Sequence, residues 1–258
     1  MIVLSNVLSG QLITVIAICI LNCSCQHRQE QRTLPDSGMS TELSGKKVLF
    51  VYGGWEGHNP EACRDLYVPW LKDEGAAVIV SNTLEVYADS ALMQSIDLII
   101  QIWTLGNIEE DQLNGLLNAV ANGTGFAGWH GGVVDAFRGT PDYHFMTGGQ
   151  FVAHPGNLID YTIHVTKPED PVMQGIKDYT IHTEQYYMHV DPDVDVLATT
   201  QFTGDHVPWL NGVLMPVIWK KIYGKGRVYI NAIGHRLEDH AVPEFETSLK
   251  RGMAWASR

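Results

Sequence analysis

The chain has 258 residues, of which 45% are apolar and 18% carry a charge. This balance is typical of a folded domain of about 200 residues and excludes an intrinsically disordered chain. The formal net charge of −12 argues against non-specific binding to nucleic acid or to anionic lipid, because both surfaces repel an acidic protein.

Residues 1–25 have the features of an export leader and are set apart from the fold. Residues 7–21 are mostly apolar, with the length of a signal-peptide core and too few residues to span a bilayer comfortably. Cys23 and Cys25 follow, as in a bacterial lipoprotein leader in which one cysteine carries the lipid. A plain N-terminal anchor or an early start codon is the alternative, because no Lys or Arg precedes the apolar run. We expect an exported lipoprotein that meets the membrane only through this leader.

Residues 26–46 are polar and contain Pro35, Gly38 and several serines and threonines, so they are expected to form a tether. Three of the four cysteines lie in the leader, which leaves Cys63 alone in the remaining domain, residues 47–258. An intradomain disulfide and a cysteine-based metal site are therefore excluded.

Residues 47–129 alternate short apolar runs with helical patterns. Asn59, Pro60 and Glu61 mark the start of one helix, since proline favours the first helical position and an acid favours the first turn. Such alternation predicts a mostly parallel sheet covered on both faces. The expected strands are 47–51, 77–80, 97–103 and 125–129, and the expected helices are 60–73 and 109–121.

The second half is richer in strands and completes an α/β fold. Tyr223-Gly224-Lys225-Gly226 is expected to form a hairpin turn between two of its strands. The apolar spacing of the last segment predicts a closing helix. The expected strands are 161–166, 179–188, 194–200, 216–223 and 226–233, and the closing helix is 243–256.

The stretch Gly128-Trp129-His130-Gly131-Gly132 ends an expected strand where a helical pattern begins. The G-x-S-x-G elbow of hydrolases has this form, with the nucleophile exposed on a tight turn. Here the exposed residue is expected to be His130. Histidine acts as an acid or base near neutral pH, or binds a metal as the neutral imidazole.

Several histidines and tryptophans fall at or just after the ends of expected strands. Ligands bind at the carboxyl ends of parallel strands, so these side chains are expected to line one pocket. For any one histidine alone, a surface or hydrogen-bonded structural role is the alternative. The set comprises Trp55 and His58, Trp103, Trp129 and His130, and His235.

Three further candidates come from outside the parallel strands. His154 lies in a glycine-containing loop, and Glu184 and Tyr186 lie close together further along. His182 and Glu184 alternate along an expected strand, so they are expected to share one face. The remaining histidines considered lack such a context, with His164 expected on a solvated face; they are His27, His164, His206 and His240.

In this order, these segments resemble the ThuA-like (trehalose-utilisation) family. The matching motifs are Gly-Trp-His130-Gly-Gly, Gly-Gly-Gln-Phe-Val-Ala-His154-Pro, Thr-Glu184-Gln-Tyr186, Pro216-Val-Ile-Trp with Tyr-Gly-Lys-Gly-Arg227-Val, and Ile-Gly-His235. One departure is Thr183, where relatives often carry an acid. The resemblance runs from about residue 46 to the C-terminus. It implies a flavodoxin-like layered sheet similar to class I glutamine amidotransferases, and a role in disaccharide or keto-sugar metabolism.

Amidotransferase chemistry itself is excluded, because it needs a thiolate at the elbow and Cys63 lies on an expected helix. Two mechanisms fit the candidates. In one, His130 and Glu184, with His235 beside them, transfer protons on a sugar that packs against Trp55, Trp103 and Trp129, with His58, His154 and Tyr186 as further contacts. In the other, some of His58, His130, His154 and His235 hold a divalent metal, the only cofactor that the sequence suggests.

Two other functions stay open. One is a sugar-binding module without chemistry, and the other is an amidase-like hydrolase that uses a metal-bound water. Clustered ionisable groups favour an enzyme over a binding module. Neither the sugar, nor the bond that changes, nor the oligomeric state follows from these residues.

Overall fold

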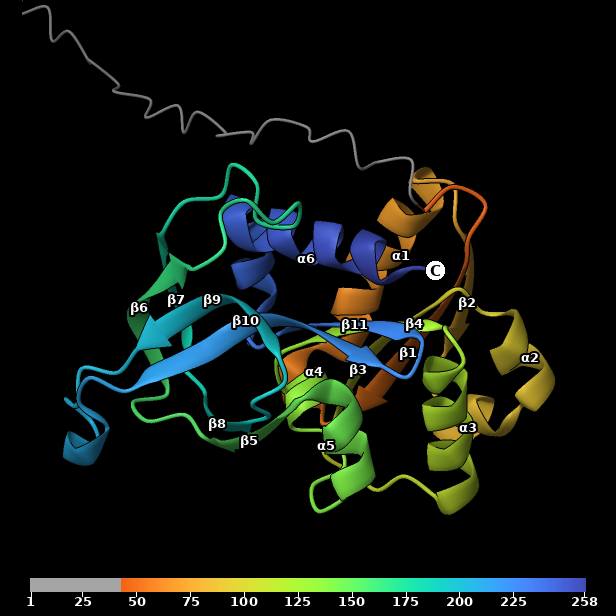
Figure 1. Cartoon of the computed structure of the whole chain (residues 1–258), viewed down its shortest axis with the longest axis horizontal. Coiled ribbons are helices and arrows are strands. Elements are labelled where there is room, and N and C mark those ends of the chain that lie inside the picture. The colour runs from red at the N-terminus through yellow and green to blue at the C-terminus, as the bar shows by residue number, and fades with distance from the viewer. Residues whose placement is uncertain (1–42) are drawn as a thin grey trace, which may run out of the picture. The chain divides into compact units, whose positions relative to one another are not determined.

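The computed structural model describes residues 43–258 (Figure 1). The expected leader and nearly all of the expected tether lie outside the described residues. Between residues 43 and 258, no helix combines the length and apolarity that a membrane crossing requires.

A nine-stranded sheet forms the centre of the described chain, in the order β2-β1-β3-β4-β11-β10-β9-β6-β7. Its first five strands are mutually parallel: β2 (Ala77–Ser81), β1 (Lys47–Gly54), β3 (Leu98–Thr104), β4 (Gly125–Trp129) and β11 (Gly226–Asn231). The other four pair antiparallel: β10 (Leu214–Tyr223), β9 (Asp195–Gln201), β6 (Leu158–Val165) and β7 (Tyr179–Glu184). The chain therefore has an α/β fold with a largely parallel core and added antiparallel strands.

Helices cover both faces of the parallel half (Figure 1). In β1, Val48 and Phe50 pack toward one face and Leu49 and Val51 toward the other, and all four are fully buried. Both faces need apolar side chains because both are covered, which explains the uninterrupted apolar run in this strand. The helices are α1 (Pro60–Asp73) and α6 (Pro243–Ala256) on the first face, and α2 (Ser90–Ser95), α3 (Glu110–Ala121), α4 (Gly131–Val134) and α5 (Pro141–Thr147) on the second.

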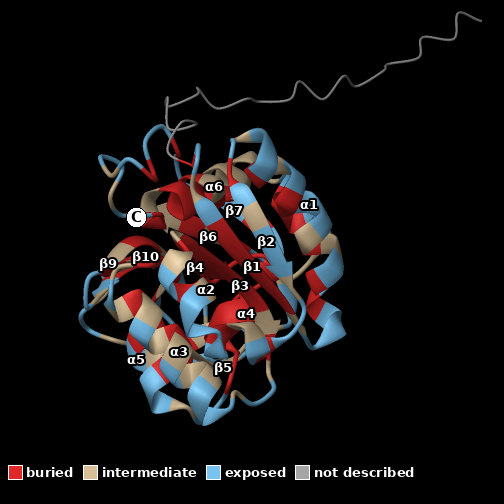
Figure 2. Cartoon of the chain, turned by 90° about the vertical axis from the view of Figure 1, so that its right-hand side faces the viewer, coloured by how far each residue is buried: buried red, intermediate tan, exposed pale blue. Residues whose placement is uncertain are grey.

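The expected helices over 60–73 and 243–256 and the expected strand over 125–129 have these bounds in the structure. Figure 2 shows β1, β3 and β4 as a buried layer between helices whose outer surfaces are exposed, whereas the edge strand β2 is mostly exposed. Buried strands of this kind leave the strongest sequence pattern, because nearly every position is apolar.

The prediction was wrong for the segment 179–188, which is two strands in different sheets. β7 ends at Glu184, and β8 (Tyr187–Val190) pairs instead with β5 (Gly149–Ala153) in a two-stranded sheet. β5 was expected to be a loop because it opens with glycines. Gly149 has a packing reason there: an added Cβ would come 2.8 Å from the ring of Trp219.

Candidate functional site

The site lies at the carboxyl ends of the parallel strands, where three loops each supply a histidine. His58 closes a 3-10 turn, Glu56–His58, directly after β1. Its side chain is buried, and its Nδ1 lies 2.8 Å from Oγ1 of Thr104, the last residue of β3. Because Nδ1 is engaged there, Nε2 is the ring nitrogen that remains for other partners.

His130 occupies the elbow between β4 and α4. Its torsion angles are φ 47° and ψ −145°, a conformation that costs a residue other than glycine some free energy. Next to it, an added Cβ on Gly131 would come 2.2 Å from the ring of His58, so glycine allows the two rings to approach to 4.7 Å between centroids. The sequence predicted an elbow, but it predicted an exposed one. His130 is only 1% exposed, because the loop after β11 and Tyr186 cover it.

His235 comes from the loop after β11, the strand that pairs with β4. This pairing places the loop beside the His130 elbow, and the two rings lie 5.4 Å apart between centroids. The carbonyl oxygen of Ala232 in the same loop accepts a hydrogen bond of 3.2 Å from Nδ1 of His130. A carbonyl can only accept, so this bond places a proton on Nδ1 of His130.

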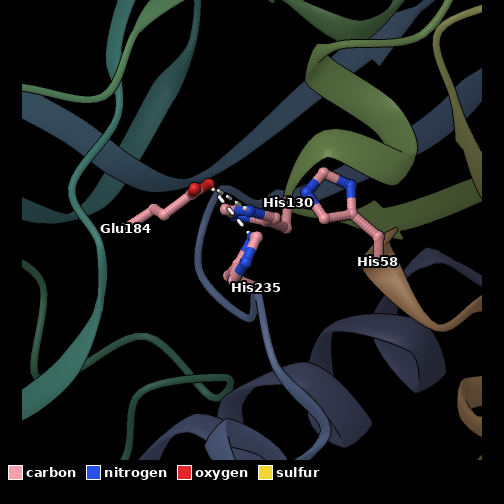
Figure 3. A group of neighbouring side chains, drawn as sticks. All are labelled: His58, His130, Glu184 and His235. Atoms are coloured by element: carbon pink, nitrogen blue, oxygen red, sulfur yellow. Dashed lines mark hydrogen bonds and ion pairs between the residues drawn. The ribbon is translucent and has the colours of Figure 1, made fainter. Parts of the chain in front are cut away.

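Glu184 reaches the three histidines from the last residue of β7. Its Oε2 lies 3.2 Å from Nε2 of His130 and 3.1 Å from Nδ1 of His235, as Figure 3 shows. Its Oε1 lies 3.8 Å from Nδ1 of His154. The site therefore has one carboxylate that faces several imidazoles. We call the four residues His58, His130, Glu184 and His235 the histidine–Glu184 cluster.

A second hydrogen-bond layer ties β7 to the loop of His235. Thr183 donates to Oδ2 of Asp239 at 2.6 Å, and the backbone N–H of His235 donates to Oγ1 of Thr183 at 3.4 Å. The phenol of Tyr161 donates to the backbone carbonyl of Glu184 at 3.0 Å. These bonds hold the end of β7 against the loop. At the position of Thr183, where relatives often carry an acid, the hydroxyl instead contacts the carboxylate of Asp239.

Burial and mutual contact determine the charges in the cluster. Burial, together with the neighbouring His130 and His235, lowers the pKa of His58 to about 2. Burial also lowers the pKa of His130, an effect that the contact with Glu184 only partly offsets. Burial raises the pKa of Glu184, but its contacts with His130 and His235 outweigh burial and hold this pKa below its ordinary value. At neutral pH, these shifts favour an ionised Glu184 carboxylate beside the neutral imidazoles of His58 and His130.

His154 and Tyr186 have different positions around Glu184. His154 follows β5 with about a third of its side chain exposed, and it stacks on Phe151. Tyr186 was expected to contact the sugar but is buried and stacks on His130, with ring centroids 4.1 Å apart. It therefore holds the His130 ring in place and does not offer a surface to a ligand.

The three tryptophans expected to pack against a sugar also differ. Trp55 is 50% exposed and makes an edge-to-face contact with His58. Trp103 is half-buried and packs on Gly53 at the same strand edge. The prediction was wrong for Trp129, which is fully buried against Phe50 and Tyr67, because side chains of a covered strand alternate between two helix layers.

The other histidines stay outside the cluster. His182 does not accompany Glu184: it is exposed and paired with Asp160, while Glu184 lies at the strand end where the chain turns inward. His164 pairs with Asp178 on an exposed face, as expected. His240 was given no special context, yet it is buried and bonded to the Tyr67 phenol at 2.6 Å.

Cys63 has no features of a nucleophile. It lies on α1, is buried, and burial raises the pKa of its thiol to about 12. The sequence missed Thr104 and Asp239. Thr104 directly follows Trp103 at a strand end, so the rule that identified the other loop residues applies to it as well. Asp239 lies in a 3-10 turn, and its link to Thr183 spans 56 residues, which no local pattern reveals.

A polar cleft of about 610 Å³ adjoins the first loop of the site. Glu56 and Asn59 line it, together with Gly53 and Gly54 at the end of β1. None of the four cluster residues lines this cleft, because their side chains already fill the space between the loops.

The family model described as trehalose utilisation, ThuA, matches residues 47–256. The chain belongs to the ThuA family. This membership connects it with carbohydrate metabolism in general, and the cluster lies within the matched residues. None of the curated proteins matches the chain.

Solved structures agree with the fold of the family. A ThuA-like protein from Bacteroides uniformis aligns with a TM-score of 0.67 at 17% identity, over 81% of this chain and 91% of that one. One from Parabacteroides merdae aligns with a TM-score of 0.66 at 18% identity, over 82% and 89%. A β-galactosidase from Rahnella sp. R3 gives 0.55 at 20% identity, over 83% of this chain but 32% of that one. At these identities, the likeness concerns the fold alone.

Proposed function

We propose that this ThuA-family chain is an enzyme that transforms a disaccharide or keto-sugar by proton transfer at the histidine–Glu184 cluster. The observation that carries the proposal is a carboxylate, 8% exposed, which faces three imidazole nitrogens at the carboxyl edge of a parallel sheet. A buried charge is costly unless neighbours compensate it, so its retention in a ligand-binding position favours a chemical role.

Glu184 is the proton acceptor in this proposal. Beside the carbonyl of a keto-sugar, the C–H bond breaks and its proton goes to the carboxylate. The electron pair of that bond forms a C=C bond while the π pair of the carbonyl moves onto its oxygen, which gives an enediolate. His130 lies 3.2 Å from Glu184 and is neutral, so it can take the proton onward through Nε2. His235 contacts the same oxygen and holds the carboxylate toward this path.

The partly exposed side chains around the cluster supply a place for the sugar. Trp55 is half-exposed beside His58, and an indole face packs well against the apolar face of a sugar ring. His154 is partly exposed, and its Nδ1 lies 3.8 Å from Oε1 of Glu184. A ring lying on Trp55 would therefore be close to the cluster, with His154 toward solvent.

A sugar-binding module without chemistry is the second candidate, and the exposed Trp55 is the observation that favours it. Such a module needs an aromatic platform and hydrogen-bonding groups, but it has no need for a buried ionised carboxylate among neutral histidines.

We propose further that the parallel half has the flavodoxin-like arrangement of class I glutamine amidotransferases. The order β2-β1-β3-β4-β11 supports this, since the flavodoxin-like order is 2-1-3-4-5. Export as a lipoprotein is also a proposal, supported by the apolar run before Cys23 and Cys25. Acyl-labelling of the native protein tests it, and an unlabelled product that retains residues 1–25 would contradict it.

Incubation of the purified protein with disaccharides and their 3-keto forms in deuterated water tests the proposed function. We expect product formation together with deuterium uptake beside the ketone. Tight sugar binding without turnover or exchange would favour the binding module, and neither binding nor turnover would contradict both candidates.

A further inference from the structure

We propose that the histidine–Glu184 cluster binds one divalent first-row transition-metal ion through a nitrogen of each histidine and an oxygen of Glu184 (Figure 3). The four ligand atoms all lie within 4.8 Å of one another. Metal–nitrogen bonds of about 2.0 Å place the ligands of a tetrahedral site about 3.3 Å apart. The distances of 3.2 and 3.1 Å from Glu184 Oε2 to His130 and His235 already have this value.

The hydrogen bond of His130 to Ala232 leaves its Nε2 available to bind a cation. Its Nδ1 carries the proton that Ala232 accepts, so Nε2 of the neutral ring presents a lone pair. That lone pair faces a carboxylate oxygen at 3.2 Å, which also carries only lone pairs when ionised. Two lone-pair acceptors in contact repel each other unless a positive charge lies between them. A metal ion supplies that charge.

His235 and His58 each also present a ring nitrogen that is available to bind the ion. Nδ1 of His235 is buried without a hydrogen-bond partner, although Glu184 Oε2 is only 3.1 Å away. His58 bonds through Nδ1 to Thr104, and its other nitrogen lies on the side of the ring toward His130 (Figure 3). Metal-binding histidines commonly bond through one nitrogen to an oxygen and bind the ion through the other. His58 and His130 both show this arrangement.

The donor set selects the class of ion. Three imidazoles and one carboxylate suit Zn²⁺, Co²⁺, Ni²⁺ or Mn²⁺, whereas Mg²⁺ and Ca²⁺ prefer sites made of oxygen. The site is reachable as well, because the side chains of Glu184 and His235 keep 10% and 17% of their surface exposed.

Within the proposed function, the ion would polarise an oxygen of the sugar. Only this role of the ion rests on the proposed function; the metal site itself does not. With the ion bound, Nε2 of His130 is a ligand, so the onward proton transfer proposed above for His130 passes to His154. Oε1 of Glu184 faces His154 at 3.8 Å, so these two groups are left to carry the proton.

Metal content and affinity test the site directly. The full-length protein is stripped with a chelator, dialysed against Zn²⁺, Co²⁺ or Mn²⁺, and analysed by elemental mass spectrometry and calorimetry. We expect one ion per chain, and a Co²⁺ absorption spectrum typical of nitrogen and oxygen ligands. Loss of a ligand in His235→Ala or Glu184→Gln should weaken binding more than the 10- to 100-fold that is typical of a lost outer partner, and Thr104→Val should fall in that range.

His182→Ala is the matched control, because His182 is exposed on β7 two residues before Glu184. It should bind as the wild type does, and circular dichroism checks that each variant is folded. Absence of stoichiometric binding of all three ions, or equal binding by the wild type and the cluster variants, would overturn the metal site. Metal binding without sugar turnover would leave the site standing and remove the proposed function. Turnover that survives metal removal would leave the proposed function standing and would overturn the statement that the ion polarises a sugar oxygen.

Discussion

The parallel and antiparallel halves of the sheet contribute to the site in different ways. The parallel half supplies the ring nitrogens, from loops that follow β1, β4 and β11. The antiparallel half supplies the carboxylate, from the end of β7, four places from β11 in the sheet. The β6–β7 hairpin pairs with β9 only at His164 and Val165, so its opposite end, where Glu184 pairs with Leu158, extends beyond the sheet. The projecting end of the β6–β7 hairpin thus brings the carboxylate of Glu184 to the histidines at the carboxyl edge of the parallel strands.

The histidines of the two halves differ in burial and in their partners. His58, His130 and His240 pack against the parallel half and are buried, with pKa values lowered by burial. His164 and His182 on the β6–β7 hairpin keep 45% and 50% of their side-chain surface exposed and are paired with aspartates. Burial in the parallel half therefore favours the neutral form of these three imidazoles, and the antiparallel half adds the carboxylate.

Removal of the carboxylate should have the largest effect. Glu184→Gln keeps the size of the side chain but removes the proton acceptor, so turnover of a keto-disaccharide should fall by about 10²- to 10⁴-fold. Steady-state kinetics measure this, with His182→Ala as the matched control on the same strand. A folded Glu184→Gln variant with near wild-type turnover would show that the antiparallel half adds nothing to the chemistry.

The next effect concerns the framework of the parallel half. Trp129→Ala should lower the free energy of unfolding by about 3–5 kcal/mol, because it empties a fully buried site on β4. Urea denaturation measures the change. Trp209→Ala is the control, since Trp209 is 82% exposed, and it should change stability by less than about 0.5 kcal/mol. Similar losses in both variants would mean that β4 does not hold the core.

Stability should also depend on pH through the buried histidines. The pKa of His240 is lowered by burial from 6.5 to about 4, so the unfolded chain binds more protons between these values. Stability is therefore lost as pH falls through this window, by about 3 kcal/mol between pH 7 and pH 4 from this residue alone. Urea titrations at several pH values should show a shallower decline for His240→Gln, with His182→Gln as control. Equal slopes in all three proteins would contradict this prediction.

The smallest effect on turnover is expected for Trp55, which lies half-exposed beside the cluster. Trp55→Ala should raise KM for the sugar about five- to tenfold, which is about 1 kcal/mol of lost ring packing, and leave kcat nearly unchanged. Its stability should match that of the wild type because Trp55 is half-exposed. A loss confined to kcat would mean that Trp55 acts on the chemistry through His58 and does not bind the sugar.

The two halves also differ in how much of them the sequence predicted. The strands and loops of the parallel half follow from local pattern, since buried strands are apolar throughout and their carboxyl ends share one edge. His58, His130 and His235 were identified in this way. Glu184 was selected as a candidate by its neighbours in the chain, but its approach depends on a hairpin and on a link from Thr183 to Asp239. The burial of Trp129 and His130 was also missed, because the helix and the loop that cover them are distant in sequence.

The measurement that tests the central claim most directly is a double-mutant cycle between the two halves. His130→Asn is preferred to alanine because it removes the imidazole but keeps a polar side chain at this buried position. The rates of the wild type, His130→Asn, Glu184→Gln and the double variant are compared on one keto-disaccharide. If the two residues form one centre, the double variant should lose little more than the more damaged single variant. If the two single losses multiply in the double variant, the residues act independently and the two halves do not build one site.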